Sequence, residues 1–523
     1  MGVAYNSRII TDGLVLALDA ANNKSILSTV EVLVVAGGGG GGMDMGGGGG
    51  GGGVIYSSAV SITPGSAITA TVGNGGVGAP AAGTNGQPGG HQYTIPATQG
   101  GNSVFGALTA IGGGFGGSSY RGYTPGIAGG SGGSGGGASG YNDNAGTFLG
   151  GSGTTGQGNR GGNSTAAYYS GGGGGAGAPG ADSTNQPNGG VGVENSILGI
   201  SYFWGGGGGG ASYSLSTGGN GGNGGGGGGA LGTTVGGSGL NPGSPGGGGS
   251  PNSWANTPGG NAGANTGGGG GGGSHYNANN KGGDGGSGIV IVRYPGSQRA
   301  TGGTVTSVGG YTIHTFTTSG TFTPTWGDMS TNGNTGTFTT GVTYNSANGG
   351  SLSFDGGDAS HIQIVNTAGQ LDFPGDFTVG LWIYPTQYHR TYQTMIDTYP
   401  GGATNGWIFT TMYSSSQVIS WYTEGSSWQP SGTAVTLNAW NYVVASRIGT
   451  TVKLYKNATE IHSHSDSSNI RGGVCRIGRG LDDANNYGNV FGRISNVQIY
   501  KGKGLTQAEI SQNFNSLRGR FGI

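Results

Sequence analysis

The sequence predicts an all-β protein in which a glycine-rich domain is inserted into a β-sandwich, with one short helix at the C-terminal end. Three observations predict this class. Glycine accounts for 135 of the 523 residues and charged residues for only 7%, which no ordinary globular domain matches. Regularly spaced short strands follow residue 325. A strand of the same kind stands alone before the glycine-rich stretch. We therefore expect three segments, at residues 1–29, 30–324 and 325–523.

The isolated strand is GLVLALDAANNKS, residues 13–25, an alternating apolar segment followed by a polar turn. We expect it to be the first strand of the C-terminal sandwich, with the glycine-rich domain inserted in the following loop. An insertion is tolerated when the two ends of the loop stay close together. Two β-branched segments at residues 30–37 and 288–296 could pair and hold those ends. The alternative is that residues 13–25 anchor the chain to another subunit.

The glycine runs lie at residues 37–42, 46–53, 171–175, 205–210, 224–229, 246–249 and 267–273. A flexible linker is one interpretation, but linkers rarely interleave so many aromatic residues. Collagen is excluded because glycine does not recur strictly at every third position. Extended helices with three residues per turn have no internal hydrogen bonds, so bare glycine runs can pack side by side and satisfy one another's backbone groups. We expect such polyglycine-II-type packing, with loops projecting from its ends.

The C-terminal region alternates apolar and polar residues in short segments. Residues 376–385, DFTVGLWIYP, predict one strand, and residues 440–461 predict two strands joined by a short turn. Near the end, Thr506 and Glu509 have the spacing of a capping box, and apolar residues follow on one helical face. A single short helix is therefore expected to pack across the sandwich.

The glycine-rich region resembles a known family. The segments VEVLVVAGGGGGG, GGNSVFGALTAIGGG, GGSGIVIVRYPG and GYTIHTFTTSGTFTP resemble the glycine-rich domains of bacteriophage tail-fibre and adhesin proteins, especially those of marine cyanophages. The resemblance covers residues 30–324. It implies packed polyglycine helices that present loops to the host.

A second resemblance covers the sandwich. The segments SLSFDGGDASHIQI, FTVGLWIYP, WNYVVASRIGTTVKLYKN and FGRISNVQIYKGKGLTQAEI resemble the laminin-G-like, concanavalin-A-like jelly roll. In phage-associated domains of this kind, a strand like residues 13–25 passes soon to a segment like residues 325–356. In this sequence the glycine-rich region separates the two, which supports the inserted topology.

Concanavalin-A-like folds include glycoside hydrolases. Whether this chain is expected to be one depends on whether its acidic residues form a catalytic pair. Glycosidases use two carboxylates that flank the scissile bond. Glutamates are few, and those at 424, 460 and 509 do not form the clustered Glu-x-Asp-x-x-Glu pattern of laminarinase-like enzymes. We expect no catalysis and no cofactor, and a glycoside hydrolase is the third hypothesis.

Four aspartates raise the question of a calcium ion: Asp355, Asp358, Asp482 and Asp483. Carboxylate oxygens are ligands that calcium takes, but aspartate next to asparagine and glycine also builds turns by bonding its own backbone. The turn interpretation is preferred. His462 and His464 alternate along a predicted strand and lack the spacing of a zinc site.

Aromatic and polar residues alternate in several predicted loops, and exposed rings beside polar groups suit glycan binding. The candidate ligand-binding residues are Trp421, Tyr422, Trp428, Tyr388, Arg390, Tyr392 and Tyr487. Trp382 and Trp440 lie in clear strands and are expected to fill the core, because aromatic residues dominate core packing.

Charge and hydropathy restrict the partners. The net charge is −1, and the glycine-rich region has almost no lysine or arginine, so nucleic acid is not an expected partner. No segment approaches 18 consecutive apolar residues, and the first residues do not resemble a signal peptide.

The resemblances and these exclusions together predict a virion protein on the tail or capsid exterior, synthesised in the host cytoplasm. A tail fibre or receptor-binding adhesin is expected to be a homo-oligomer that contacts other virion proteins and a host-surface glycan or outer-membrane protein. The alternative is a capsid-decorating or head-fibre protein. The copy number and position of the chain in virions would separate the two.

Overall fold

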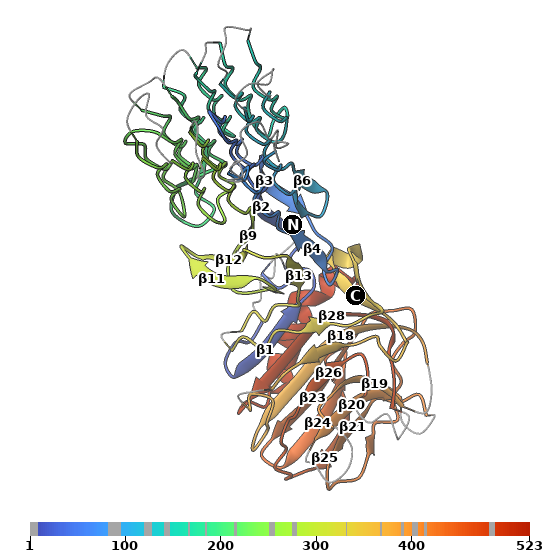
Figure 1. Ribbon diagram of the computed structural model, residues 1–523. Coiled ribbons are helices and arrows are strands. Elements are labelled where there is room, and N and C mark those ends of the chain that lie inside the picture. The colour runs from blue at the N-terminus through green and yellow to red at the C-terminus, as the bar shows by residue number, and fades with distance from the viewer. Residues whose placement is uncertain are drawn as a thin grey trace, which may run out of the picture.

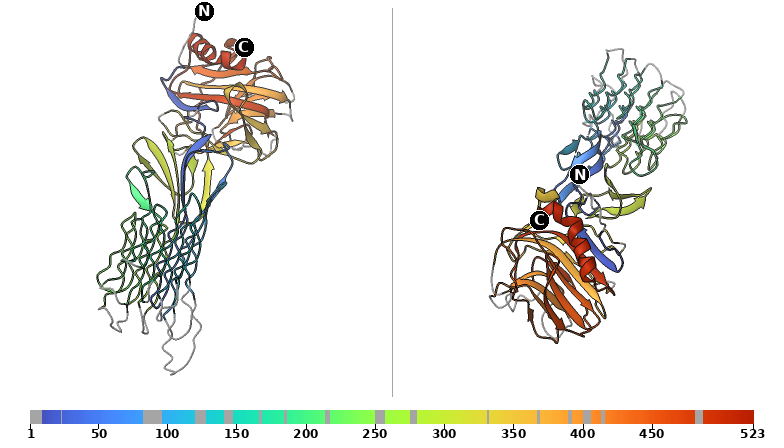
Figure 2. Two further views of the ribbon diagram at one scale, coloured as in Figure 1. Left: turned by 90° about the horizontal axis from the view of Figure 1, so that it is seen from above. Right: turned by 180° about the vertical axis from the view of Figure 1, so that it is seen from behind.

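The computed structural model describes residues 9–22, 24–81, 96–119, 128–140, 147–165, 168–183, 186–213, 217–249, 257–274, 280–330, 332–366, 369–388, 392–399, 406–412, 416–480 and 487–523. It is almost entirely β, with two bodies joined by a narrow neck (Figure 1). One body is the sandwich and the other is the elongated glycine-rich domain. Figure 2 shows the glycine runs lying side by side and extending away from the sandwich.

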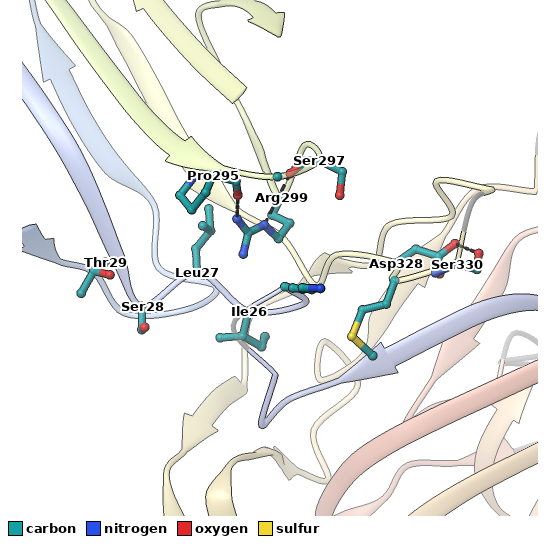
Figure 3. Close-up of a pocket in the computed structure, with 12 residues that line it drawn as sticks. Ile26, Leu27, Ser28, Thr29, Pro295, Ser297, Arg299, Asp328 and Ser330 are labelled. Atoms are coloured by element: carbon teal, nitrogen blue, oxygen red, sulfur yellow. Dashed lines mark hydrogen bonds between the residues drawn. The ribbon is translucent and has the colours of Figure 1, made fainter. Parts of the chain in front are cut away.

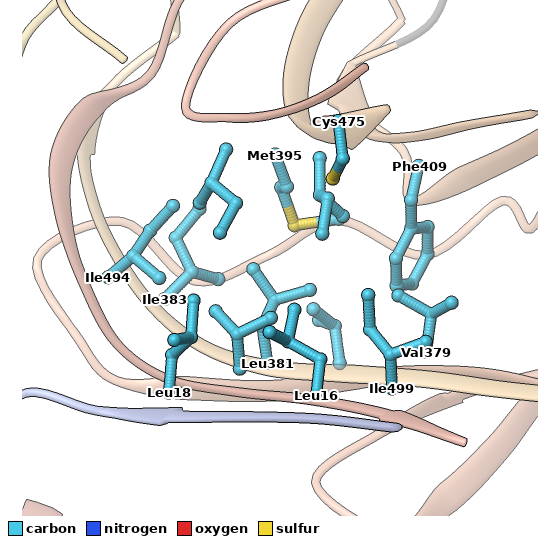
Figure 4. Close-up of a cluster of buried hydrophobic side chains, with 14 of the residues drawn as sticks. Leu16, Leu18, Val379, Leu381, Ile383, Met395, Phe409, Cys475, Ile494 and Ile499 are labelled. Carbon is cyan, nitrogen blue, oxygen red and sulfur yellow. The ribbon is translucent and has the colours of Figure 1, made fainter. Parts of the chain in front are cut away.

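The sandwich has two sheets. The first sheet contains β15 (Val342–Asn345), β16 (Ser351–Asp355), β28 (Phe491–Lys501), β18 (Phe377–Gln387), β23 (Asn441–Ile448), β24 (Thr451–Lys456) and β25 (Thr459–Ser465) in that order, with β1 (Leu14–Asp19) also paired to β28. The second sheet contains β14 (Thr337–Phe338), β17 (Ile362–Ile364), β26 (Cys475–Ile477), β19 (Tyr392–Asp397), β20 (Trp407–Met412), β21 (Ser420–Thr423) and β22 (Gln429–Pro430), with β27 (Tyr487–Gly488) beside β19. Apolar side chains of both sheets fill the space between them (Figure 4).

Strand β1 is part of the sandwich although the glycine-rich domain follows it in the chain. It pairs antiparallel with β28, and Leu16 and Leu18 are fully buried in the core between the sheets (Figure 4). Its other edge is covered by the segment after the insertion, where Asp328 Oδ1 accepts a hydrogen bond from the Ala17 N–H at 2.9 Å. At the end of β1, Arg520 donates to Asp19 Oδ1 at 2.6 Å. Both edges of β1 are therefore held by residues that follow it by some 300 positions or more.

The two ends of the insertion touch. The Gly327 N–H donates to the Ser25 carbonyl at 2.7 Å, and the Ser25 hydroxyl donates to the Gly327 carbonyl. Closing a loop costs little extra entropy as the loop grows, so a large domain can be inserted where its ends already meet.

Two small sheets form the base of the glycine-rich domain. One has the order β11 (Thr304–Val308), β12 (Tyr311–Phe316), β9 (Ile289–Pro295), β2 (Thr29–Val35) and β3 (Val54–Ser61). The other has the order β10 (Ala300–Thr301), β13 (Gly320–Pro324), β4 (Ile68–Thr71), β5 (Ser103–Phe105) and β6 (Leu108–Ala110), and a separate hairpin joins β7 (Val193–Asn195) to β8 (Tyr202–Trp204). The two framing segments predicted to pair do so, as β2 with β9.

Beyond these sheets, the glycine runs form a hydrogen-bonded lattice with a period of three residues. In the run at 37–42, residues 37 and 40 donate to the segment at 98–101, residues 38 and 41 to 283–286, and residues 39 and 42 to 47–50. Each successive N–H therefore turns toward a different neighbour and returns to the first after three residues. This is the pattern of three-residue-per-turn helices, each bonded to several others.

At many positions inside this lattice only glycine fits. A Cβ atom on Gly49 would lie 2.1 Å from the carbonyl oxygen of Gly39, and one on Gly41 would lie 2.0 Å from that of Gly271. The obstacles are backbone atoms, which cannot rotate away as a side chain can. The entropy that each glycine loses on ordering is offset by these backbone hydrogen bonds.

At the surface of the lattice, polar side chains accept the outward-facing N–H groups. Six such bonds, 2.7–3.0 Å long, are donated by the backbone N–H groups of Gly112 to Asn102, Gly150 to Asn163, Asn220 to Asn188, Val235 to Asn220, Asp284 to Asn261 and Gly78 to Asp284. These side chains close the outer surface of the lattice, because they satisfy donors that would otherwise face solvent or another chain.

The predicted helix is α1 (Gln507–Leu517), which begins with the expected capping box of Thr506 and Glu509. Short 3-10 turns lie at η1 (Ala347–Gly349) and η2 (Arg518–Phe521). Helix α1 packs on the outer face of the first sheet, where Phe514 stacks against Trp382 with ring centroids 5.6 Å apart. Trp382 and Trp440 are buried as predicted, but in this sheet–helix layer instead of between the sheets. Among the described residues, no helix has the length and apolar character that a membrane crossing requires.

Candidate binding surface

The outer face of the second sheet carries the candidate site. Phe409 of β20 pairs with Ile396 of β19 and with Trp421 of β21, and all three side chains belong to the core between the sheets. Side chains alternate along a strand, so the neighbouring residues Ile408 and Tyr422, which pair with each other, face outward.

Three aromatic rings form a continuous stack on this face. The ring of Trp428 lies between Tyr392 at 5.2 Å and Tyr422 at 5.0 Å between centroids, with interplanar angles of 27° and 28°. All three side chains are half-buried, so part of each remains open to solvent. Tyr399, at the end of β19, meets Tyr422 edge-on at 5.6 Å. We call Tyr392, Trp428 and Tyr422 the ring stack.

A carboxylate lies at the edge of the ring stack. The Tyr422 hydroxyl donates to Glu424 Oε2 at 3.1 Å. Burial and this hydrogen bond raise the pKa of Tyr422, so the phenol stays protonated at physiological pH and remains a donor. Oxygen atoms that can accept hydrogen bonds thus lie beside an apolar ring surface.

The same side of the sheet continues toward β26 with polar residues, of which Asp397, Thr394 and Thr410 are fully buried. In the strand register, Arg476 of β26 lies opposite Asp397 of β19 on one side and opposite Gln363 of β17 on the other. Thr394 and Thr410 lie opposite each other, and their buried hydroxyl groups have no hydrogen-bond partner in the described part of the chain. Burying an unpaired hydroxyl costs free energy.

The structure brings together three of the predicted ligand-binding residues and removes a fourth. Trp421 was predicted as a ligand contact, and this is wrong because its side chain is fully buried. Its ring stacks between Phe377 at 5.1 Å and Trp407 at 5.4 Å. The physical reason is strand alternation, since Trp421 and Tyr422 are adjacent in β21 and must face opposite sides.

The remaining predicted residues lie apart from the ring stack or outside the described side chains. Tyr388 is half-buried against the core, and its hydroxyl donates to the Val435 carbonyl at 2.9 Å. The backbone of Tyr487 pairs directly with Tyr392 through β27 and β19, but its side chain is not among those described. Arg390 lies outside the described residues.

Tyr399 was missed by sequence reasoning. It follows the last residues of β19 and is 8% exposed. The signal available was its position two residues after β19, a strand whose first residue, Tyr392, was already a candidate, but the bulge in β19 between Thr394 and Ile396 shifts the alternation. A count of every second residue from Tyr392 therefore assigns Tyr399 to the wrong face.

The aspartates considered for calcium form turns where the structure describes them. Asp355 Oδ1 accepts a hydrogen bond from the Gly357 N–H at 2.8 Å, and Asp358 Oδ1 accepts one from Asn489 at 3.0 Å. Asp482 and Asp483 lie outside the described residues. The described residues contain no group of three histidine, cysteine, aspartate or glutamate side chains placed to hold a metal ion.

A cavity of about 510 Å³ lies at the neck between the two bodies (Figure 3). Two of the three charged residues that line it, Asp328 and Arg299, are engaged in the neck itself. The Asp328 carboxylate accepts hydrogen bonds from Ala17, Ser330 and Asn334, and the Arg299 guanidinium donates to the carbonyls of Pro295 and Ser297. We therefore assign this cavity to the joint between the bodies and place the candidate site on the ring stack.

His462 and His464 lie on β25 opposite Leu454 and Val452, so they face inward at the edge of the sandwich. Both ring nitrogens of His464 are buried and have no hydrogen-bond partner among the residues that the structure describes. Burial and the neighbouring His462 lower the pKa of His464 to about 4 from its ordinary value of 6.5.

This lowered pKa predicts loss of stability in acid. Between about pH 6.5 and 4 the unfolded chain binds a proton at His464 that the folded chain does not, so stability is complete above this window and falls as the pH drops through it. After allowance for partial solvent screening, the loss is about 1–2 kcal/mol. Melting temperatures of the native chain and His464→Leu, measured from pH 7 to 4, should show a shallower decline for the variant. Equal slopes would contradict the assignment to His464.

With fold and site described, the chain can be placed among known proteins. It is a two-domain β protein and belongs to the glycine-rich domain family, whose match covers residues 22–295. The concanavalin A-like lectin/glucanases superfamily matches residues 354–511, within the sandwich. No curated protein sequence matches the chain significantly.

Several solved structures resemble part of the chain. Domain 4 of AbnA, an extracellular arabinanase from Geobacillus stearothermophilus in complex with arabinotriose, is 18% identical over 36% of this chain and 91% of its own, with a TM-score of 0.30. The binding domain of Paraclostridial Mosquitocidal Protein 1 is 18% identical over 36% and 49%, with a TM-score of 0.29. The receptor binding domain of botulinum neurotoxin type G is 16% identical over 36% and 48%, also with a TM-score of 0.29. The match thus spans about half the length of each toxin domain.

Proposed function

We propose that this protein is a bacteriophage adhesin, a tail-fibre or receptor-binding protein that binds a host-surface glycan without catalysis. The observation that carries the proposal is the ring stack, three half-buried aromatic rings in stacked contact on the outer face of the second sheet. The phage origin rests on the resemblance of the glycine-rich segments to phage tail-fibre and adhesin domains.

The ring stack suits a sugar chain for chemical reasons. One face of a pyranose ring carries mainly C–H groups, which pack against aromatic rings, while its hydroxyls need donors and acceptors. The Glu424 carboxylate and the Tyr422 hydroxyl oxygen provide acceptors for sugar hydroxyls at the edge of the stack, since the Tyr422 O–H is already donated to Glu424. Binding sites commonly combine aromatic side chains with a few polar groups that fix orientation.

The glycine-rich domain would act as a spacer that sets the distance between the sandwich and the rest of the virion. Its runs are bonded to one another along their length, so the domain is a stiff spacer, in contrast to a glycine-rich random coil. A stiff spacer holds the sandwich at a fixed distance from whatever lies at the far end of the domain. This suits a protein that projects from a virion toward a cell surface.

Trp428→Ala is expected to weaken binding to host polysaccharide by about tenfold or more, because it removes the central ring and a tenfold loss corresponds to about 1.4 kcal/mol. Binding of the purified full chain to immobilised host polysaccharide measures the effect. Tyr56→Ala is the matched control, since Tyr56 is 46% exposed on the glycine-rich domain and far from the stack in the fold. Equal binding of Trp428→Ala and the native chain would reject the ring stack as the glycan site.

The assignment to the virion needs a separate experiment. Cryo-electron microscopy of intact virions should place the chain at the tail, with few copies. A regular array over the capsid would replace the adhesin proposal with surface decoration. The same purified chain should release no reducing sugar from host polysaccharide, and release would show that the sandwich is a glycosidase.

A further inference from the structure

Strand β11 is an open sheet edge. It is the terminal strand of its five-stranded sheet and, among the described strands, pairs only with β12, in a regular register from Thr304–Thr315 to Val308–Tyr311. Four of its five residues are exposed. The β11–β12 hairpin stands out from the neck in Figure 1. An edge of this kind presents a row of backbone donors and acceptors that another strand can pair with.

The other long edges in the described part of the chain are protected. Strand β3 contains a bulge opposite Val30 and Val32, and β25 has a bulge as well as the charged Glu460. The free side of β1 is covered by hydrogen bonds from the segment that contains Asp328. At the surface of the glycine lattice, asparagine and aspartate side chains accept outward-facing N–H groups. Bulges, charges and covering segments are the usual means by which proteins prevent edge pairing.

Strand β11 has no bulge and no charge, and no covering segment in the described part of the chain donates hydrogen bonds to its free side. Its sequence, TVTSV, contains no proline either. No charged residue occurs between Arg299 and Asp328. Two exposed apolar side chains lie close by, Val308 at 43% and Ile200 at 61% exposure, and the turn at Gly199 packs directly against the Val308 side chain.

We propose that β11 is a self-association edge, where β11 of a second copy of this chain adds antiparallel to extend the sheet. The sequence supports a copy as the partner. Antiparallel pairing about Thr306 places Thr306 opposite its own counterpart, Val305 opposite Ser307, and Thr304 opposite Val308. Threonine and β-branched pairs are favourable across strands, and the absence of charge removes the repulsion that identical edges would otherwise have. The twofold contact also covers Val308 and Ile200. This inference does not depend on the proposed function.

Charge substitutions at the centre of the pairing test it. The native full chain should dimerise with rising concentration in sedimentation velocity. Thr306→Lys and Thr306→Glu should each be monomeric, because the symmetry places two like charges opposite each other. An equimolar mixture of the two variants should restore the dimer, since opposite charges then meet. Thr306 is exposed, so neither variant should change the melting temperature.

Ser58→Lys is the control, because Ser58 is exposed on β3, the other edge of the same sheet, and this variant should dimerise like the native chain. A native chain that stays monomeric throughout the micromolar range would overturn the proposal. A dimer that persists in Thr306→Lys would do the same, since the contact would then lie elsewhere.

Discussion

Gly49→Ala is expected to unfold the glycine-rich domain or to lower its stability by more than the 1–3 kcal/mol typical of an overpacked core, that is by about 3 kcal/mol or more. Gly49 lies inside the run at 46–53, and its N–H donates to the Gly270 carbonyl at 2.8 Å. The added methyl group would overlap the Gly39 carbonyl oxygen, 2.1 Å from the ideal Cβ position. Relief would require one run to move, which would break its hydrogen bonds to the other runs. Hydrogen exchange measured by mass spectrometry on the full chain should show lost protection in the glycine runs and unchanged protection in the sandwich.

Gly248→Ala provides the matched control within the same domain. The nearest atom to a Cβ at Gly248 is 3.8 Å away, and the residue is not in the left-handed region that favours glycine. The same substitution there should change stability by no more than about 0.5 kcal/mol, as for most surface positions. Equal effects at the two positions would mean that the cost comes from the intrinsic conformational freedom of glycine instead of from the lattice.

Leu18→Ala is expected to destabilise the sandwich by about 2–5 kcal/mol, because it leaves a cavity among fully buried residues. The effect should appear in the strands of residues 337–501, although Leu18 precedes the glycine-rich domain in the chain. Hydrogen exchange again provides the measurement, with faster exchange expected in β18 and β28 than in the native chain. The exposed Thr11, just before β1, supplies the control variant Thr11→Ala. If Leu18→Ala leaves exchange in the sandwich unchanged, β1 is not an integral strand of that sheet.

The features predicted correctly are those set by local chemistry. The capping box begins α1 at the expected residue, and the alternation in residues 376–385 forms the central strand β18. The glycine runs are extended and packed, because no side chains are present to keep their backbones apart. The partner of each run could not be predicted, since identical glycine backbones carry no information about which run lies beside which.

The ring stack was predicted only in part, because local sequence indicates which residues are candidates but not which strands lie side by side. Tyr392, Tyr422 and Trp428 were each candidates because they lie in aromatic-polar segments, but their contact depends on the pairing of β19, β20 and β21. Trp421 was placed on the wrong side because the boundaries of β21 were not evident within WYTEGSSWQ. Once the register is known, Trp421 faces the core with Phe409 and Tyr422 faces outward.

The three-residue period of the glycine lattice also governs how such a domain can change length over evolutionary time. Inserting three residues into a run adds one full helical turn, about 9 Å at 3.1 Å per residue, and leaves every downstream N–H directed at its original neighbour. Inserting one or two residues rotates all following donors by a third or two thirds of a turn, toward the wrong run. Length variation among proteins with this architecture should therefore occur in multiples of three residues within runs, while loops between runs vary without such a restriction.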